Sequence, residues 1–233
     1  MSTPNCARCA EKSQICRETN GHAPEGCPTV THAHLLGAVL GEYDRPPTHH
    51  FALEASRQEA EGYAGRGRQP FVLQPDKCRL EETIEFCQRM GFRRLGLAFC
   101  AGLAQEARML HRILEKHGFS VVGVACKVGG VPKERLGLAD DEKIRIGQHE
   151  TMCNPILQAS VLNEAATDFN LMLGLCVGHD ALFLKHVKSP TTVFAVKDRV
   201  TGHNPLAALY TSRSYYRRLH EAADGPDAER KQE

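Results

Sequence analysis

The sequence predicts an α/β protein: a three-layer, Rossmann-like or flavodoxin-like domain built on a parallel sheet, with a small N-terminal module that binds a metal through cysteines. Two observations predict the sheet. Short apolar segments typical of buried strands recur after residue 90, and a helical pattern follows each of them. Because strands and helices alternate, we expect parallel strands, right-handed crossovers and helices on both faces of the sheet. A third observation, the clustered cysteines near the N-terminus, predicts the module.

The expected elements of the α/β domain follow in chain order. An amphipathic helix ending at Gly91 opens the domain, and a long loop with Gly129-Gly130 and Pro132 interrupts it. Asn154-Pro155 and Asn204-Pro205 are typical helix starts. The apolar and β-branched segments predict strands at 94–100, 119–126, 170–177 and 191–196. The helical patterns cover 79–90, 101–117, 154–166, a short segment after residue 178, and 206–219.

The boundaries follow from composition. We expect a cysteine-bearing module at 1–28, a linker or helical segment at 29–75, the α/β domain at 76–220 and a disordered tail at 221–233. Within the second segment, 31–43 and 51–63 are candidate helices, with a break at Pro46-Pro47.

Charge and hydropathy narrow the classes of function. The net charge of +1 gives no electrostatic reason to expect nucleic acid or a membrane surface as a partner. No apolar segment is as long as a membrane span, and the N-terminus lacks a hydrophobic signal core, which predicts a cytoplasmic protein. Cytosolic thiols stay reduced, so ten cysteines in such a protein indicate metal or redox chemistry before structural disulfides.

The first cysteine group has the spacing C-x2-C-x6-C-x10-C. The segment around it has almost no apolar content, and a short polar segment of this kind usually needs a tetrathiolate metal site for stability. Zinc and an iron–sulfur cluster both remain candidates; disulfides or a disordered tail are the structural alternatives. The expected metal ligands are Cys6, Cys9, Cys16 and Cys27.

A second cysteine group follows the architecture of the sheet. Cys100 and Cys126 end predicted strands, Cys176 lies at the end of a third, and Cys153 precedes a capped helix. Strand carboxyl ends and helix N-termini share one edge of such a fold, where ligands bind. We therefore predict that these four thiols bind one cofactor, although single buried cysteines are also common in strands. If only three of them bind, the metal keeps an open position for substrate.

Polar residues surround this edge. The candidate catalytic residues are His179, Asp180, Lys197, Asp198 and His203, each close to the end of a predicted strand. Asp180 could instead cap its own helix, and the charged sequence Lys197-Asp198-Arg199 could form an ion pair or bind an anion. Glycine-rich phosphate loops and serine nucleophile elbows are absent from the sequence.

Several strings resemble a bacterial and archaeal family, a domain of unknown function, described as uncharacterised, cysteine-rich, metal-binding proteins. They are the N-terminal cysteine group, LGLAFCAGL at 95–103, MCNPILQA at 152–159, GLCVGHDALF at 174–183 and VKDRVTGHNPLAALY at 196–210. The resemblance implies metal binding through cysteines and supplies no reaction.

The leading hypothesis is an iron–sulfur protein, with a 4Fe–4S cluster serving redox or sulfur chemistry on a small molecule or a redox partner protein. The alternative is a zinc-binding structural or regulatory protein without catalysis. A third hypothesis is a thiol redox enzyme with no metal in the main domain.

Overall fold

The computed structural model describes residues 3–221, which divide along the chain into two compact units, with the boundary between Asp76 and Lys77. The first unit carries three helices and a small antiparallel strand pair, β1 (Tyr63–Ala64) with β2 (Gln74–Pro75). Its helices are α1 (Pro28–Thr31), α2 (Leu36–Tyr43) and α3 (Pro46–Glu61).

Pro46-Pro47 was predicted to separate two helices, with the second beginning at Phe51. The separation is confirmed, since α2 ends at Tyr43, but α3 begins at the prolines themselves and not at Phe51, because the first turn of a helix has no use for the amide hydrogen that proline lacks. The β1–β2 pair was not predicted, since strands of two residues leave no periodic pattern.

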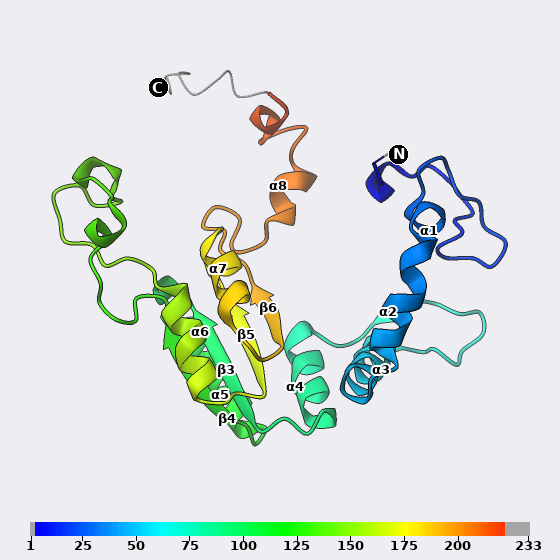
Figure 1. The fold of residues 1–233 in the computed structure, drawn as a ribbon, viewed down its shortest axis with the longest axis horizontal. Coiled ribbons are helices and arrows are strands. Elements are labelled where there is room, and N and C mark those ends of the chain that lie inside the picture. The colour runs from blue at the N-terminus through cyan, green and yellow to red at the C-terminus, as the bar shows by residue number, and fades with distance from the viewer. Residues whose placement is uncertain (1–2, 222–233) are drawn as a thin grey trace. The chain divides into compact units, whose positions relative to one another are not determined.

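The second unit contains a four-stranded, all-parallel sheet in the order β4-β3-β5-β6 (Figure 1). The predicted three-layer α/β fold is confirmed. The strands are β3 (Arg94–Phe99), β4 (Ser120–Ala125), β5 (Phe169–Leu173) and β6 (Thr191–Ala195). The helices are α4 (Arg79–Arg89), α5 (Ala104–Lys116), α6 (Pro155–Glu164), α7 (His179–His186) and α8 (Leu206–Tyr210).

The strand order reverses direction between β3 and β5. The chain goes outward from β3 to β4 and then crosses back over β3 to reach β5 and β6. Right-handed crossovers in opposite directions place α5 on one face of the sheet, and α6 and α7 on the other. In such sheets the carboxyl ends of the two strands at the reversal form the usual ligand-binding crevice.

The core under α6 and α7 shows the expected alternation of side chains. Ala98, Val124 and Met172 point from three neighbouring strands to the same face, where they pack with Leu162 of α6 and Phe183 of α7. Every residue of β5 is buried, as expected for a central strand covered on both faces.

A buried polar side chain of β5 lies against a glycine of β3. The Asn170 side chain is fully buried, and its Oδ1 accepts a hydrogen bond of 2.7 Å from the Thr167 hydroxyl. A Cβ atom on Gly96 of β3 would lie 2.0 Å from the same oxygen. Gly96 is therefore needed because the Asn170 side chain approaches its backbone closely, and not because its backbone has a positive φ.

The long loop between β4 and α6 has structure of its own. Two 3₁₀ turns (Lys133–Leu136 and Asp140–Glu142) and an isolated bridge between Pro132 and Thr151 organise it. Buried Lys143 forms ion pairs of 2.5 Å with Glu134 and 2.8 Å with Asp140. The two ends of this loop carry Cys126 and Cys153.

The helix predicted for 206–219 is shorter than expected. It ends at Tyr210, and a 3₁₀ turn (Arg217–His220) follows separately. Hydroxyl side chains after Tyr210 form hydrogen bonds with backbone carbonyls and so compete with continuation of the helix. The Thr211 hydroxyl, for example, donates to the Ala207 carbonyl at 2.7 Å. Of the predicted tail, residues 222–233 lie outside the described part of the chain. Among the residues described, no helix combines the length and apolar character needed to span a membrane.

Candidate functional site

The carboxyl edge of the sheet collects three of the four predicted thiols. Cys100 follows β3 directly, Cys126 follows β4 directly, and Cys153 precedes the first residues of α6. The Asn154 N–H donates to the Cys126 carbonyl at 2.7 Å, which holds the start of α6 against the end of β4. The predicted N-cap is confirmed, because Asn154 Oδ1 accepts from the Leu157 N–H at 3.1 Å.

Cys100, Cys126 and Cys153, here called the thiol trio, are in hydrogen-bond contact. Cys126 is the central member: its thiol is hydrogen-bonded to that of Cys100, and its Sγ lies 3.8 Å from the Sγ of Cys153. The Ala101 N–H also donates to the Cys126 sulfur at 3.3 Å. Cys100 and Cys126 are buried, and Cys153 is half-buried. Crossovers therefore bring sulfurs far apart in the sequence to one place.

Proton sharing within the trio separates the acidities of its members. The hydrogen bond from Cys126 lowers the pKa of Cys100 to about 5, and Lys197 contributes to this shift. The same kind of bond lowers the pKa of Cys153 to about 6, with help from the charges of Lys127 and His179. The pKa of Cys126 is raised, because its proton is held between the other two sulfurs. The coupling therefore favours the thiolate form at the two outer sulfurs over the central one.

A buried amide in α6 fixes the two strand ends that carry the trio. Gln158 Nε2 donates to the Val124 carbonyl at 2.7 Å and to the Phe99 carbonyl at 3.2 Å, and the side chain is fully buried. These carbonyls lie within two residues of Cys126 and Cys100. The sequence reasoning missed Gln158, although a glutamine within the apolar string ILQASVL was a visible signal.

Cys176, the fourth predicted ligand, has a different partner. It lies beyond the end of β5, and its Sγ accepts a hydrogen bond of 3.3 Å from Arg199 Nη2. Arg199 also interacts electrostatically with Cys100 and Cys153, so Cys176 belongs to the same edge. The hydrogen bond to the Cys176 sulfur raises the pKa of the Arg199 guanidinium further.

Two lysines bring further positive charge to the trio. Lys197 is hydrogen-bonded to Cys100, and both groups surround Gly102: a Cβ there would lie 3.3 Å from Lys197 Nζ and 3.8 Å from Cys100 Sγ. Lys127 donates to the Thr151 carbonyl, close enough to Cys153 to lower its pKa. Lys127 was not among the predicted site residues, because a lysine in a polar loop gives no signal of its own.

The two predicted catalytic residues on α7 lie at its first turn. His179 is close enough to Cys153 to lower the pKa of that thiol, and its buried Nδ1 has no hydrogen-bond partner among the described residues. The N-cap of α7 is Gly178, which makes no side-chain capping hydrogen bond, and Asp180 lies in the first turn, where its Oδ1 accepts from the Ala181 N–H at 2.7 Å.

Asp198 and His203 shape the loop after β6. Asp198 Oδ1 accepts from the N–H groups of Val200 and Thr201, both at 3.0 Å, and these hydrogen bonds with Thr201 lower the pKa of the carboxyl. His203 Nδ1 accepts from the Asp198 N–H at 3.1 Å, and His203 has a positive φ of 66°. Both side chains hold Arg199 in a closed turn beside Cys176.

The N-terminal cysteines lie in the other unit. Cys6 and Cys9 form the ends of a tight turn in which the Cys9 N–H donates to the Cys6 carbonyl at 3.1 Å. Gln14 Nε2 donates to the Cys9 sulfur at 3.7 Å, and the Cys27 carbonyl accepts bonds from the first turn of α1. Cys6 and Cys16 are exposed, and Cys9 and Cys27 are half-exposed.

Neither cysteine group is arranged as a finished metal site. Across residues 3–221, no three His, Cys, Asp or Glu side chains are already placed to hold one ion. The trio is in contact through hydrogen bonds, so a metal ion would have to displace protons and draw the sulfurs around itself.

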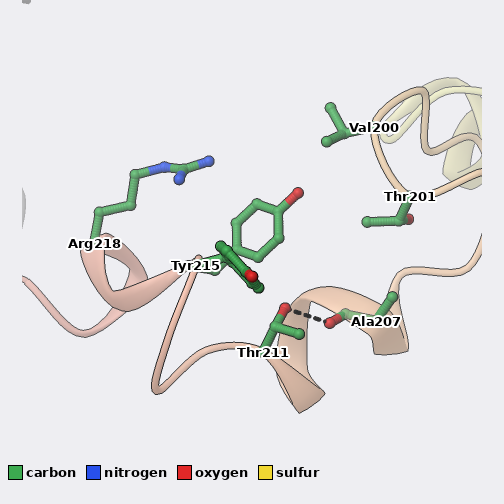
Figure 2. A pocket seen from close by; sticks show the side chains of 7 residues that line it. Val200, Thr201, Ala207, Thr211, Tyr215 and Arg218 are labelled. Carbon is green, nitrogen blue, oxygen red and sulfur yellow. Dashed lines mark hydrogen bonds between the residues drawn. The ribbon is translucent and has the colours of Figure 1, made fainter.

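A pocket of about 540 Å³ is lined by the loop after β6, by α8 and by residues that follow α8. Figure 2 shows the Tyr215 ring and the Arg218 guanidinium across the pocket from Val200 and Thr201. None of the predicted site residues lines it. Its lining residues are Val200, Thr201, Ala207, Thr211, Tyr215, Tyr216 and Arg218.

Fold and site together define a parallel α/β protein of the doubly wound type, with a thiol-lined edge at its strand-order reversal. The chain belongs to the family described as "Protein of unknown function (DUF1847)", which it matches over residues 27–194. It is 53% identical over 140 residues to the uncharacterized protein MJ0455 of Methanocaldococcus jannaschii, an alignment that covers 60% of this chain and 69% of that protein. The predicted membership of an uncharacterised family is confirmed. The matched region contains the thiol trio and Cys176, and it begins at Cys27.

Proposed function

We propose that this protein binds a metal through cysteine thiolates, and that the metal is held as an iron–sulfur cluster at the carboxyl edge of the sheet. The thiol trio would supply ligands, and Cys176 is the fourth candidate. The observation that supports this most strongly is the contact among three thiols that are distant in the sequence: Cys100 comes from the connection between β3 and α5, and Cys126 and Cys153 come from opposite ends of the long loop between β4 and α6. Isolated buried cysteines have no reason to meet in this way.

The chemistry of the donor set fits a thiophilic metal. Metals bind thiolates and not thiols, and two members of the trio have pKa values lowered to about 5 and about 6. The Ala101 N–H already points at the Cys126 sulfur at 3.3 Å, and N–H groups that donate to ligand sulfurs are typical around iron–sulfur clusters. Burial of Cys100 and Cys126 would limit the access of water.

When bound, a cluster would supply a site for electron transfer or an open iron for a sulfur-containing or oxygen-containing substrate. The chain itself would supply the surroundings of that site. Gln158 fixes the strand ends, Lys197 and Arg199 offset the negative charge of the thiolates, and His179 lies close enough to Cys153 to lower the pKa of that thiol. The small molecule or redox partner protein would approach this edge.

Zinc is the second candidate, and one distance favours it. Two sulfurs bound at about 2.3 Å to one tetrahedral zinc ion lie about 3.8 Å apart. The Sγ atoms of Cys126 and Cys153 are separated by 3.8 Å. A zinc site at this edge would support a structural or regulatory role, or a Lewis-acid role if one position stayed open.

The test is anaerobic purification followed by iron, zinc and acid-labile sulfide analysis. We expect brown protein that bleaches in air and contains both iron and sulfide. Three variants locate the metal: the trio changed to serine, the N-terminal group Cys6, Cys9, Cys16 and Cys27 changed to serine, and Cys78→Ser as a matched control outside both groups. Colourless protein with stoichiometric zinc would refute the iron–sulfur cluster and support zinc, the second candidate. Protein without any metal would refute both.

A further inference from the structure

Lys197 and Arg199 flank the thiols in a way that leaves most of their hydrogen-bond donors unused. Arg199 Nη2 donates to Cys176 Sγ at 3.3 Å, and its side chain is exposed. Lys197 is hydrogen-bonded to Cys100 and half-buried. A guanidinium has five N–H donors and an ammonium has three, so each group can bind a further acceptor while keeping its sulfur partner.

The carboxylates of the same edge are occupied elsewhere. Asp198 Oδ1 accepts two backbone N–H groups of its own loop at 3.0 Å, and Asp180 Oδ1 accepts the Ala181 N–H at 2.7 Å. Within residues 3–221, no ion pair joins Lys197 or Arg199 to a carboxylate. The positively charged groups of Lys197 and Arg199 therefore contact the thiols and are otherwise open to solvent.

The charges that face the thiols can be counted for the state in which a metal is bound. A divalent ion, or a cluster core of the same charge, bound by three thiolates carries one net negative charge. Lys127, Lys197 and Arg199 bring three positive charges to the same thiols. Counted without the carboxylates of the edge, one positive charge remains even if Cys176 is a thiolate. Asp180 and Asp198 more than offset that charge in total, but their hydrogen bonds to backbone N–H groups hold them away from Lys197 and Arg199, which keep their free donors.

We propose, on the basis of the metal site proposed above, that Lys197 and Arg199 bind the anionic group of a small-molecule substrate and hold it beside Cys176. The group is a carboxylate or a phosphate, because the guanidinium fork matches a pair of oxygens and the ammonium adds a point charge. In this arrangement the trio carries the metal, and Cys176 remains outside its coordination sphere, next to the substrate.

The experiment compares two alkylating reagents that differ mainly in charge. Anaerobically purified protein, with its metal content measured on the same sample, is labelled with anionic iodoacetate or with neutral iodoacetamide. The labelling rate of Cys176 is followed by peptide mass spectrometry. The ratio of the two rates reports the attraction of an anion, because any change in the thiolate fraction of Cys176 affects both reagents equally. The variants are Arg199→Gln and, as a control, Lys116→Gln, an exposed lysine at the end of α5 away from this edge.

We expect the iodoacetate-to-iodoacetamide ratio to fall about fourfold in Arg199→Gln and to stay unchanged in Lys116→Gln. Inorganic phosphate or acetate, each compared with sodium chloride at equal ionic strength, should slow the iodoacetate reaction in the wild-type protein and not in Arg199→Gln. Stronger protection by phosphate identifies a phosphate-bearing substrate, and stronger protection by acetate a carboxylate.

Equal ratios in wild-type protein and Arg199→Gln would overturn the proposed anion site. Metal-loaded protein in which Cys176 resists both reagents would also overturn it, because Cys176 would then be a ligand. If the protein contains no metal but the ratio still falls in Arg199→Gln, the anion site stands and the metal proposal fails.

Discussion

Removing the central thiol of the trio should raise the pKa values of the other two. In the wild-type protein, proton donation from Cys126 is the largest cause of the lowered pKa values of Cys100, about 5, and Cys153, about 6. Cys126→Ala removes that donor and leaves desolvation, which raises a thiol pKa, against the smaller lowering by Lys197 at Cys100 and by Lys127 and His179 at Cys153. We therefore expect both pKa values to rise by about two units or more, toward or beyond the ordinary value of 9.0.

The assay is the pH dependence of alkylation in metal-free, reduced protein, followed separately for each cysteine by mass spectrometry. The midpoint of each profile is the quantity to compare. Absolute rates are a poor guide, because a thiolate of lower pKa is also a weaker nucleophile and the two effects offset each other. Cys126 should remain unlabelled at the pH where its two neighbours react, since its own pKa is raised.

Two results would refute the reasoning. Wild-type midpoints near 9 for both Cys100 and Cys153 would mean that the trio does not share protons. Midpoints that stay acidic in Cys126→Ala would mean that the lysines lower the pKa values and the Cys126 thiol does not. Cys78→Ala, at the exposed start of α4, is the control and should leave both midpoints unchanged.

Three further predictions concern stability. Gln158→Leu should lower the free energy of unfolding in urea by about 1–3 kcal/mol, since the Val124 and Phe99 carbonyls lose the side-chain donor that ties them to α6, although Phe99 keeps the Cys126 N–H, whereas exposed Gln105→Leu should change little; equal effects would contradict the anchoring role. Gly96→Ala should cost about 1–3 kcal/mol in the same assay through the clash with Asn170, and full stability would show that the strands can separate locally. Burial raises the pKa of Cys87 to about 12, so native protein should resist alkylation there at pH 9 and lose stability as the pH rises above the pKa of the unfolded thiol. Rapid labelling of native Cys87 at pH 9 would disprove its burial.

The sheet was predictable because its strands carry strong local signals. Buried segments such as the one containing β5 are apolar throughout, and the alternation with helices fixes the parallel topology. Topology in turn placed Cys100, Cys126 and Cys153 at one edge before any distance was known. The burial of Cys87 in the amphipathic helix α4 was predicted in the same way and is confirmed.

The partners within the site were not predictable to the same extent. The contact of Gln158 with two strand ends depends on the rotation of α6, and the pairing of Arg199 with Cys176 depends on how a loop closes around Asp198. Neither depends on a repeating pattern. The start of α3 at Pro46 was misjudged because a proline pair either interrupts or begins a helix, and the residues on both sides decide between the two.

Metal content in the trio variant tests the central claim most directly. Cys100, Cys126 and Cys153 are changed together to serine, and iron, zinc and sulfide are measured per chain after anaerobic purification, beside wild-type protein and Cys78→Ser. We expect the wild-type protein and the control to contain metal, and the triple variant to lose the fraction held by the α/β domain while retaining its fold by circular dichroism. A folded triple variant with undiminished metal would contradict the account, because the sulfurs brought together at the sheet edge would then bind nothing.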